Sequence, residues 1–263
     1  MPVLVFLLGL LLGVAINAAA DSLPLSRRLE APRCLGCGAP RPHAAWLGIT
    51  AFLAGKRRCT YCGSPRSWRA VMVELTSALG AVWIYQRDPS LPVFLAGLTI
   101  AAFFLLIAVI DIEHRLILHP VSLTAAIVIG AIGVLDPARG ALRTLAGGLA
   151  GLAIVLVLYW LGGLFSRFVA RVRGQELDEV AFGFGDVTLA GVIGLAVGWP
   201  GVILALMLGI MAAGVFSIGY VLVMLLRGRY NAFSPIPYGP FLIAGALLVY
   251  FGGRGFFLPL VSS

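Results

Sequence analysis

The feature that most constrains this chain is a series of long apolar stretches that carry almost no charge. Several of them approach the ~20 residues that a helix needs to cross the hydrocarbon core of a bilayer. Soluble domains are typically about 25% charged, whereas only 11% of these 263 residues are Asp, Glu, Lys or Arg. The mean hydropathy is +1.02. These values exclude a soluble globular domain and predict an all-α polytopic membrane protein.

Hydropathy along the chain predicts eight membrane spans. The expected ranges are 2–19, 70–86, 91–110, 120–136, 142–165, 186–199, 201–226 and 238–258. The spans 186–199 and 201–226 are separate only if Gly198-Trp199-Pro200-Gly201 forms a tight turn, which is expected because Pro and Gly together interrupt helices. Without this turn the chain would have seven spans.

The N-terminal stretch could be either a cleaved secretory signal or an uncleaved anchor. It ends in Ala18-Ala19-Ala20, which resembles a cleavage site, but no Lys or Arg precedes Arg27. Signals carry a basic segment before the apolar run, so we expect an uncleaved helix with its N-terminus outside. With eight spans, most basic residues then lie on the cytoplasmic side, as topology rules require. Seven spans would place Arg227 and Arg229 outside.

This topology divides the chain into a first transmembrane helix (1–19), a cytoplasmic loop (20–69) and a transmembrane core (70–263).

The net charge of +8 could indicate nucleic-acid binding. In a membrane protein, however, basic residues mostly report orientation. We therefore expect membrane lipid, and no nucleic acid, among the partners.

The cytoplasmic loop contains every cysteine of the chain. They form two CxxC pairs, Cys34 with Cys37 and Cys59 with Cys62. Two such pairs at this distance suit a tetrahedral zinc site of four thiolates. Two disulfides are the alternative, which a reducing cytoplasm disfavours, and His43 could in principle replace one ligand. We predict a structural zinc that stabilises a segment too short to build its own core.

Acidic residues at membrane depth are costly and are therefore candidates for function. Four of the eleven acids fall within or at the ends of predicted spans: Glu74, Asp111, Glu113 and Asp186. Asp111 and Asp186 lie at the same, cytoplasmic, end of their helices. Two carboxyls that share one proton can hydrolyse a peptide, because one polarises the carbonyl while the other takes a proton from water.

Each aspartate also has an ordinary structural explanation. Asp111 could pair with Arg115 four residues later, and Asp186 could be an acid favoured by the dipole at a helix N-terminus. Gly183 and Gly185, which precede Asp186, would allow backbone and substrate to approach closely.

Together these motifs resemble the bacterial type IV prepilin peptidases, a family of aspartic proteases with a GxGD motif, and the resemblance runs along the whole chain. Besides the two CxxC pairs, it rests on Asn17, Leu23-Pro24, Trp68-Arg69, Glu74-Leu75, Asp111-Ile112-Glu113-His114-Arg115, Gly183-Phe184-Gly185-Asp186-Val187 and Ile236-Pro237-Tyr238-Gly239-Pro240-Phe241-Leu242.

The resemblance implies that Asp111 and Asp186 are catalytic, that Gly183, Gly185, Glu74 and Glu113 support the motifs, and that the protein lies in the inner membrane. Its substrates would be prepilins and pilin-like secretion subunits, cut after a short basic leader at the cytoplasmic edge of their own apolar helix. The new N-terminus would then be N-methylated with S-adenosylmethionine. The acids Glu176, Asp178 and Glu179 could hold the basic leader.

Some positions depart from the family pattern. His119 stands where the family carries an acid, and Ala70-Val71 replace a common Tyr-Pro.

Two other functions stay open on the sequence alone. One is a transporter that relays protons or cations through buried carboxylates, and the other is a catalytically silent assembly factor of a pilus or secretion system.

Overall fold

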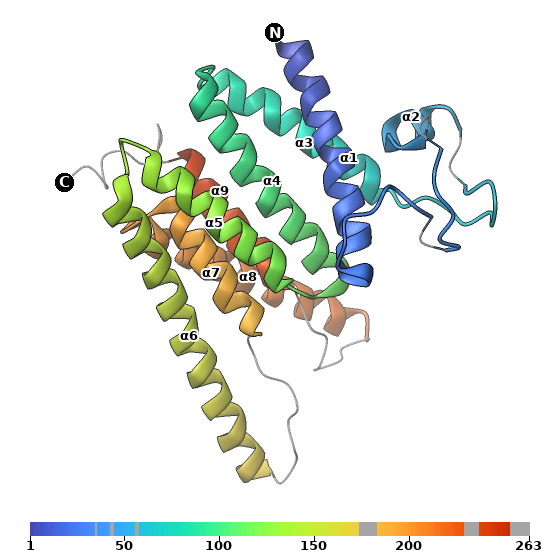
Figure 1. Ribbon diagram of the computed structural model, residues 1–263. Helices are drawn as coiled ribbons and strands as arrows, with labels where there is room; N and C mark the ends of the chain where they lie inside the picture. Colours follow the sequence, from blue (N-terminus) through green and yellow to red (C-terminus); the bar gives the residue numbers. More distant parts are fainter. Residues whose placement is uncertain (35, 43–44, 56–57, 174–182, 229–236, 253–263) are drawn as a thin grey trace. The chain divides into compact units, whose positions relative to one another are not determined.

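In the computed structural model, the described residues are 1–34, 36–42, 45–55, 58–173, 183–228 and 237–252 (Figure 1). Helices dominate this part of the chain, and it contains no β-strand beyond two isolated bridges in the cysteine loop. The expected all-α fold is therefore confirmed.

Each predicted span overlaps one helix, and the end of the span 238–258 lies outside the described residues. The helices are α1 (Pro2–Ser26), α2 (Gly48–Leu53), α3 (Arg69–Arg87), α4 (Leu91–His114), α5 (His119–Leu135), α6 (Gly140–Arg173), α7 (Phe184–Val197), α8 (Gly201–Leu226) and α9 (Gly239–Gly252). Only the short α2, inside the cysteine loop, was not expected. The predicted turn at Gly198–Pro200 separates α7 from α8, as the eight-span reading requires.

Length and composition support a multi-pass membrane protein. Helices α1, α4 and α8, together with Gly140–Phe165 of α6, are long and apolar enough to cross a bilayer. Helices α5, α7 and α9 are apolar but shorter. Eight complete crossings, and the orientation of the N-terminus, stay predictions.

The chain forms two compact units, Met1–Ile110 and Asp111–Ser263. In unit 1, α1 packs along α3, and α2 packs against α3 as well. Polar contacts reinforce the first pairing, since Asn17 Nδ2 donates to the Ala70 carbonyl at 3.0 Å and Asp21 forms an ion pair with Arg69. The loop is thereby fixed at both of its ends.

In unit 2, α7 is the central helix. It packs against α5, α6, α8 and α9, and its contact with α6 is the most extensive (Figure 1). The side chains of Val187, Leu189 and Ile193 are accordingly almost fully buried. The Gly-Phe-Gly-Asp motif lies at the first turn of this helix, so the best-packed element of unit 2 carries Asp186.

Candidate active site and metal centre

Asp111 lies in the last turn of α4, and its side chain is buried, with the residue only 6% exposed. Its Oδ2 accepts a hydrogen bond from the backbone N–H of Gly239, the first residue of α9, at 3.1 Å. The first N–H groups of a helix have no partner within the helix, so this carboxylate satisfies one of them. A Cβ on residue 239 would lie 2.6 Å from Oδ2. A larger residue at position 239 would therefore displace the Asp111 carboxylate.

Asp186 lies in the first turn of α7 and is half-buried. Its Oδ2 accepts from the backbone N–H of Gly183, the N-cap residue, at 3.0 Å. The structural explanation for this acid, a carboxylate at a helix N-terminus, is thus present in the molecule. It occupies one carboxylate oxygen and leaves the other available for chemistry.

The two aspartates have the same arrangement, although 75 positions separate them in the sequence. Each has one oxygen fixed by a backbone N–H at a helix N-terminus, and no residue of the described chain bonds the other oxygen. Both aspartates lie in unit 2, and Gly185, next to Asp186, packs closely against Ile117, which follows Asp111 in the chain. Such a pair can hold a single proton between two acids.

The structural alternative for Asp111, an ion pair with Arg115, is not seen among the described residues. The Arg115 side chain is exposed. The backbone N–H of Arg115 instead bonds the Asp111 carbonyl at 2.8 Å, with Arg115 in the left-handed conformation at φ 53°. Arg115 therefore follows the end of α4 and does not neutralise the Asp111 carboxylate.

The two glycines of the motif differ in their surroundings. A Cβ on Gly185 would lie 2.8 Å from Cβ of Ile117, a buried residue between α4 and α5. A Cβ on Gly183 would approach nothing closer than 3.7 Å. Gly185 therefore allows the first turn of α7 to approach the segment that follows Asp111, whereas Gly183 has room for a methyl group.

Two further predicted positions lie close in sequence to Asp111. Glu113 is exposed, two residues after it. His119, which departs from the family pattern, begins α5, and its ring centroid lies 5.8 Å from that of Phe184 in the glycine motif. The histidine is thus beside the first turn of α7. The acidic cluster Glu176, Asp178 and Glu179 lies outside the described residues, as does His43.

Glu74 has contacts of a different kind. It is fully buried in unit 1, and its two oxygens accept from the backbone N–H groups of Gly48, at 2.6 Å, and Ile49, at 2.9 Å. These are the first residues of α2. Glu74 therefore holds the short helix of the cysteine loop against α3.

The four cysteines come together as the sequence predicts. All four sulfur atoms lie within 4.8 Å of one another, and the shortest separations are 3.7 Å for Cys34 with Cys62 and 3.8 Å for Cys37 with Cys59. Four thiolates around one zinc at ~2.3 Å would have sulfur atoms about 3.8 Å apart. All four cysteines are free thiols, so the arrangement fits a metal and differs from the alternative of two disulfides.

Each CxxC pair forms the same turn. Gly38 N–H bonds the Cys34 carbonyl and Gly63 N–H bonds the Cys59 carbonyl, at 2.8 and 3.0 Å, with both glycines at φ 71°. The turns share the pattern Arg-Cys-x-x-Cys-Gly-x-Pro-Arg, starting at Arg33 and at Arg58. This internal repeat is visible in the sequence, but the spacing of the cysteines alone does not reveal it.

The repeats differ at one position that affects the metal site. Ser64 of the second repeat corresponds to Ala39 of the first, and its hydroxyl lies 3.3 Å from Cys34 Sγ. This hydrogen bond is the largest of several causes that together lower the pKa of the Cys34 thiol to about 6, among them the backbone N–H groups of Gly36 and Cys37, while burial acts in the opposite direction. The thiolate form, which binds metals, is therefore favoured at neutral pH.

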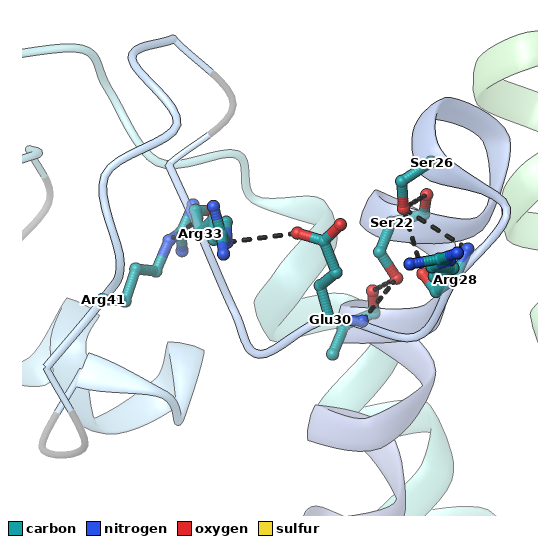
Figure 2. Close-up of polar contacts among 7 residues, drawn as sticks. Ser22, Ser26, Arg28, Glu30, Arg33 and Arg41 are labelled. Carbon is teal, nitrogen blue, oxygen red and sulfur yellow. Dashed lines mark hydrogen bonds and ion pairs between the residues drawn. The ribbon is translucent and has the colours of Figure 1, made fainter.

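A short polar segment connects α1 to the first repeat (Figure 2). The Glu30 N–H donates to Ser22 Oγ at 3.4 Å, the Glu30 carboxylate pairs with Arg33 at 3.2 Å, and Arg41 Nε donates to the Arg33 carbonyl at 3.0 Å. These contacts join the C-terminal part of α1 to the cysteine cluster.

Unit 1 also contains a cavity of about 760 Å³ that the sequence did not predict. Asn17, Asp21, Arg41, Arg66 and Arg69 contribute polar groups to its lining, which also includes Cys34 and Cys59. Buried Asn17 Oδ1 and Arg66 Nε have no hydrogen-bond partner among the described residues. Both atoms are inaccessible, and the terminal nitrogens of Arg66 already donate to the carbonyls of Ala45 and Trp46.

Comparisons with known proteins cover both units. Residues 98–218, which include both aspartates, match the profile of the type IV leader peptidase family, and residues 7–87 match the bacterial peptidase A24 N-terminal domain. A prepilin leader peptidase/N-methyltransferase of Burkholderia pseudomallei is 32% identical over 92% of this chain and 74% of its own length.

Proteins with the same name are 28% identical in Aeromonas salmonicida, over 95% of this chain and 90% of theirs, and in Bacillus subtilis, over 95% and 94%. No solved structure matches.

Proposed function

This chain belongs to the type IV leader peptidase family, and from that premise we propose that it cleaves the basic leader of type IV prepilins and pilin-like secretion subunits. Cleavage would take place at the cytoplasmic face of the inner membrane. Asp111 and Asp186 are the proposed catalytic residues. The observation that carries this proposal is that each aspartate has one oxygen fixed by a backbone N–H and the other unbonded within the described chain.

This arrangement suits an aspartic protease mechanism. The protonated aspartate donates a hydrogen bond to the scissile carbonyl, and the ionised one takes a proton from the attacking water. The new C–O bond gives a tetrahedral intermediate. Its collapse breaks the C–N bond, and the leaving amine receives a proton from the pair. The backbone N–H groups of Gly183 and Gly239 keep both carboxyls oriented throughout the cycle.

The second proposed activity is N-methylation of the newly exposed N-terminus. S-Adenosylmethionine, when bound, would supply the methyl group: its carbon–sulfur bond would break to leave a thioether as the substrate amine forms a carbon–nitrogen bond and loses a proton. The cavity of unit 1 would hold such a molecule, because Asp21, Arg41, Arg66 and Arg69 give its lining charges of both signs. Charged side chains of opposite sign can bind the carboxylate and the amine of one ligand.

The metal centre is proposed to be structural. Zinc bound by Cys34, Cys37, Cys59 and Cys62 would leave no open coordination position, which is typical of structural rather than catalytic sites. It would link the two repeats of the loop, which otherwise has few buried side chains. Glu74 would support the same loop through α2.

Purified protein in detergent, incubated with a prepilin, tests the proposal. Mass spectrometry should show loss of the leader, and addition of S-adenosylmethionine should add the mass of one methyl group to the cleaved product only. A precursor that stays intact would favour the silent assembly factor instead. Cleavage without methylation would retain the peptidase and remove the second activity.

A further inference from the structure

Arg139 lies in the short connection between α5 and α6, beside the C-terminal end of α7 (Figure 1). Its side chain is only 13% exposed, and the mechanism above gives it no part. A buried charge is costly unless it is paired and hydrogen-bonded. The partners of this arginine should therefore show what it does.

The first partners of Arg139 are carbonyl groups at the end of α7. Its Nη1 donates to the carbonyls of Leu195, at 3.2 Å, and of Ala196. The last four carbonyls of a helix have no partner within the helix, and they form the negative end of its dipole. Arg139 therefore satisfies two of these groups with a positive charge.

Arg139 also contacts α9 and α5. Its Cζ lies 5.5 Å from the centre of the Tyr250 ring in α9, a distance typical of a cation–π interaction. Its Nη2 lies 3.7 Å from a carboxylate oxygen of Asp136, the C-cap residue of α5. Three helices therefore meet at one guanidinium group.

The two helices that end near Arg139 are the ones that begin beside the aspartates. Helix α7 carries Asp186 in its first turn, and α9 begins with Gly239, whose N–H bonds Asp111. Along α7, ten residues separate Asp186 from Ala196, about 15 Å at ~1.5 Å per residue. Along α9, eleven residues separate Gly239 from Tyr250, about 17 Å on the same basis. Arg139 thus lies nearly the same length of helix from each carboxylate.

Close apolar packing holds each of these helices to another neighbour. Gly194 of α7 lies against Gly147 of α6, and Gly245 of α9 lies against Gly209 of α8. Apolar burial is non-directional, so it does not by itself fix how far α7 is shifted along α9. Hydrogen bonds to two particular carbonyls of α7, made by a group that also lies over one ring of α9, do fix this shift.

We infer that Arg139 is a positioning residue, which aligns α7 with α9 at one end so that Asp186 and Asp111 are correctly placed at the other. This inference rests on the proposed function. A shift of one helix along the other would separate the two carboxyls, and a misplacement of about 1 Å can cost a hundredfold in rate. Arg139 acts through the two helices and does not touch the substrate.

The first experiment removes the donors of Arg139 and keeps its apolar stem. Arg139→Met should lower kcat for prepilin cleavage about tenfold and leave KM within about twofold of wild type, because alignment of the carboxyls affects the reaction rather than substrate binding. Arg143→Met is the matched control. Arg143 lies four residues later, is exposed, and bonds the described chain through its backbone carbonyl, so both of its kinetic parameters should match wild type.

Arg139→Lys keeps the charge but lacks the planar fork of donors, so its kcat should fall less, about threefold. It also serves as the test variant if Arg139→Met does not accumulate in the membrane. A purely stabilising role of Arg139 would lower the melting temperature and leave kcat of the folded protein unchanged. That result, or equal losses of kcat in Arg139→Met and Arg143→Met, would overturn the inference.

The second experiment measures the alignment without turnover. Genetically encoded spin labels at position 184, exposed at the start of α7, and at position 244, exposed on α9, report the distance between the two helices. We expect the same narrow distribution with Arg139 intact and with Arg143→Met, and a shifted or broader one with Arg139→Met. Identical distributions in all three proteins would overturn the inference. Failure of the proposed function would be seen separately, as an intact prepilin with the unmodified protein.

Discussion

The two units each bury a carboxylate against the start of a helix, but in different ways. Glu74 in unit 1 accepts one backbone N–H on each oxygen, so both oxygens are bonded. Asp111 in unit 2 accepts one N–H on a single oxygen and keeps the other unbonded by the described residues. A carboxylate bonded on both oxygens holds structure, whereas one bonded on one oxygen is oriented and still able to exchange a proton. Burial alone does not distinguish the two.

The comparison predicts opposite outcomes for two isosteric substitutions. Asp111→Asn should lower kcat for prepilin cleavage at least about a hundredfold, with an unchanged melting temperature, because an amide oxygen can still accept from Gly239. Glu74→Gln should lower the free energy of unfolding by about 2 kcal/mol, since the amide nitrogen would face a backbone N–H, while kcat stays near wild type. Cleavage assays and thermal melts of both variants check this. A large loss of kcat in Glu74→Gln without destabilisation would contradict the structural role.

The next largest loss of activity is expected from a substitution at Gly239, whose backbone N–H bonds Asp111. Gly239→Ala should lower kcat about tenfold to a hundredfold, because the new methyl group displaces the carboxylate from its position. Gly183→Ala is the control, since its Cβ would meet nothing closer than 3.7 Å. Near-normal turnover of Gly239→Ala would show that the position of Asp111 is not critical.

Removal of the metal should affect unit 1 more than catalysis. We expect about one zinc per chain by elemental analysis, and Cys34→Ser with Cys37→Ser should release it and lower the melting temperature, because the two repeats lose their link. Cleavage should fall less than in Asp111→Asn. Ser64→Ala, which removes only the hydrogen bond to Cys34, should retain the zinc. Freshly purified protein without any thiophilic metal would refute the site.

The smallest change in the rate of prepilin cleavage is expected from a substitution at Glu113. Its side chain is exposed, and the proposed mechanism gives it no proton to transfer. Glu113→Gln should therefore keep kcat within about twofold of wild type, since substitutions at exposed positions are usually mild. A loss comparable to that of Asp111→Asn would place Glu113 in the mechanism.

Hydropathy was sufficient to predict the long helices because backbone groups in a bilayer must be satisfied within one segment. It underestimated the lengths of α1 and α6, because a helix can continue after its apolar part ends. The predicted spans end at residues 19 and 165, whereas the helices end at Ser26 and Arg173. Cysteine spacing predicted the four-cysteine cluster for a similar reason, as the two members of each CxxC pair are close in sequence. Helix α2 is short and has no periodic pattern to reveal it.

The long-range contacts could not be predicted in the same way. Topology placed Asp111 and Asp186 at one end of the helices, but no local pattern linked Asp111 to Gly239, 128 positions away. The resemblance included Glu74 among the motifs without indicating that both of its oxygens bind α2. Such assignments depend on which N–H groups the folded chain leaves without a partner, and this is a property of packing rather than of spacing.

The claim that Asp111 and Asp186 form one catalytic unit is tested most directly by the rate of prepilin cleavage in Asp111→Asn, in Asp186→Asn and in the double variant. Residues that act as a unit show strongly non-additive losses. We predict that each single variant loses as much activity as the double variant, with all three inserted and folded as wild type. Substantial turnover in either single variant, or losses that multiply in the double variant, would contradict the shared mechanism.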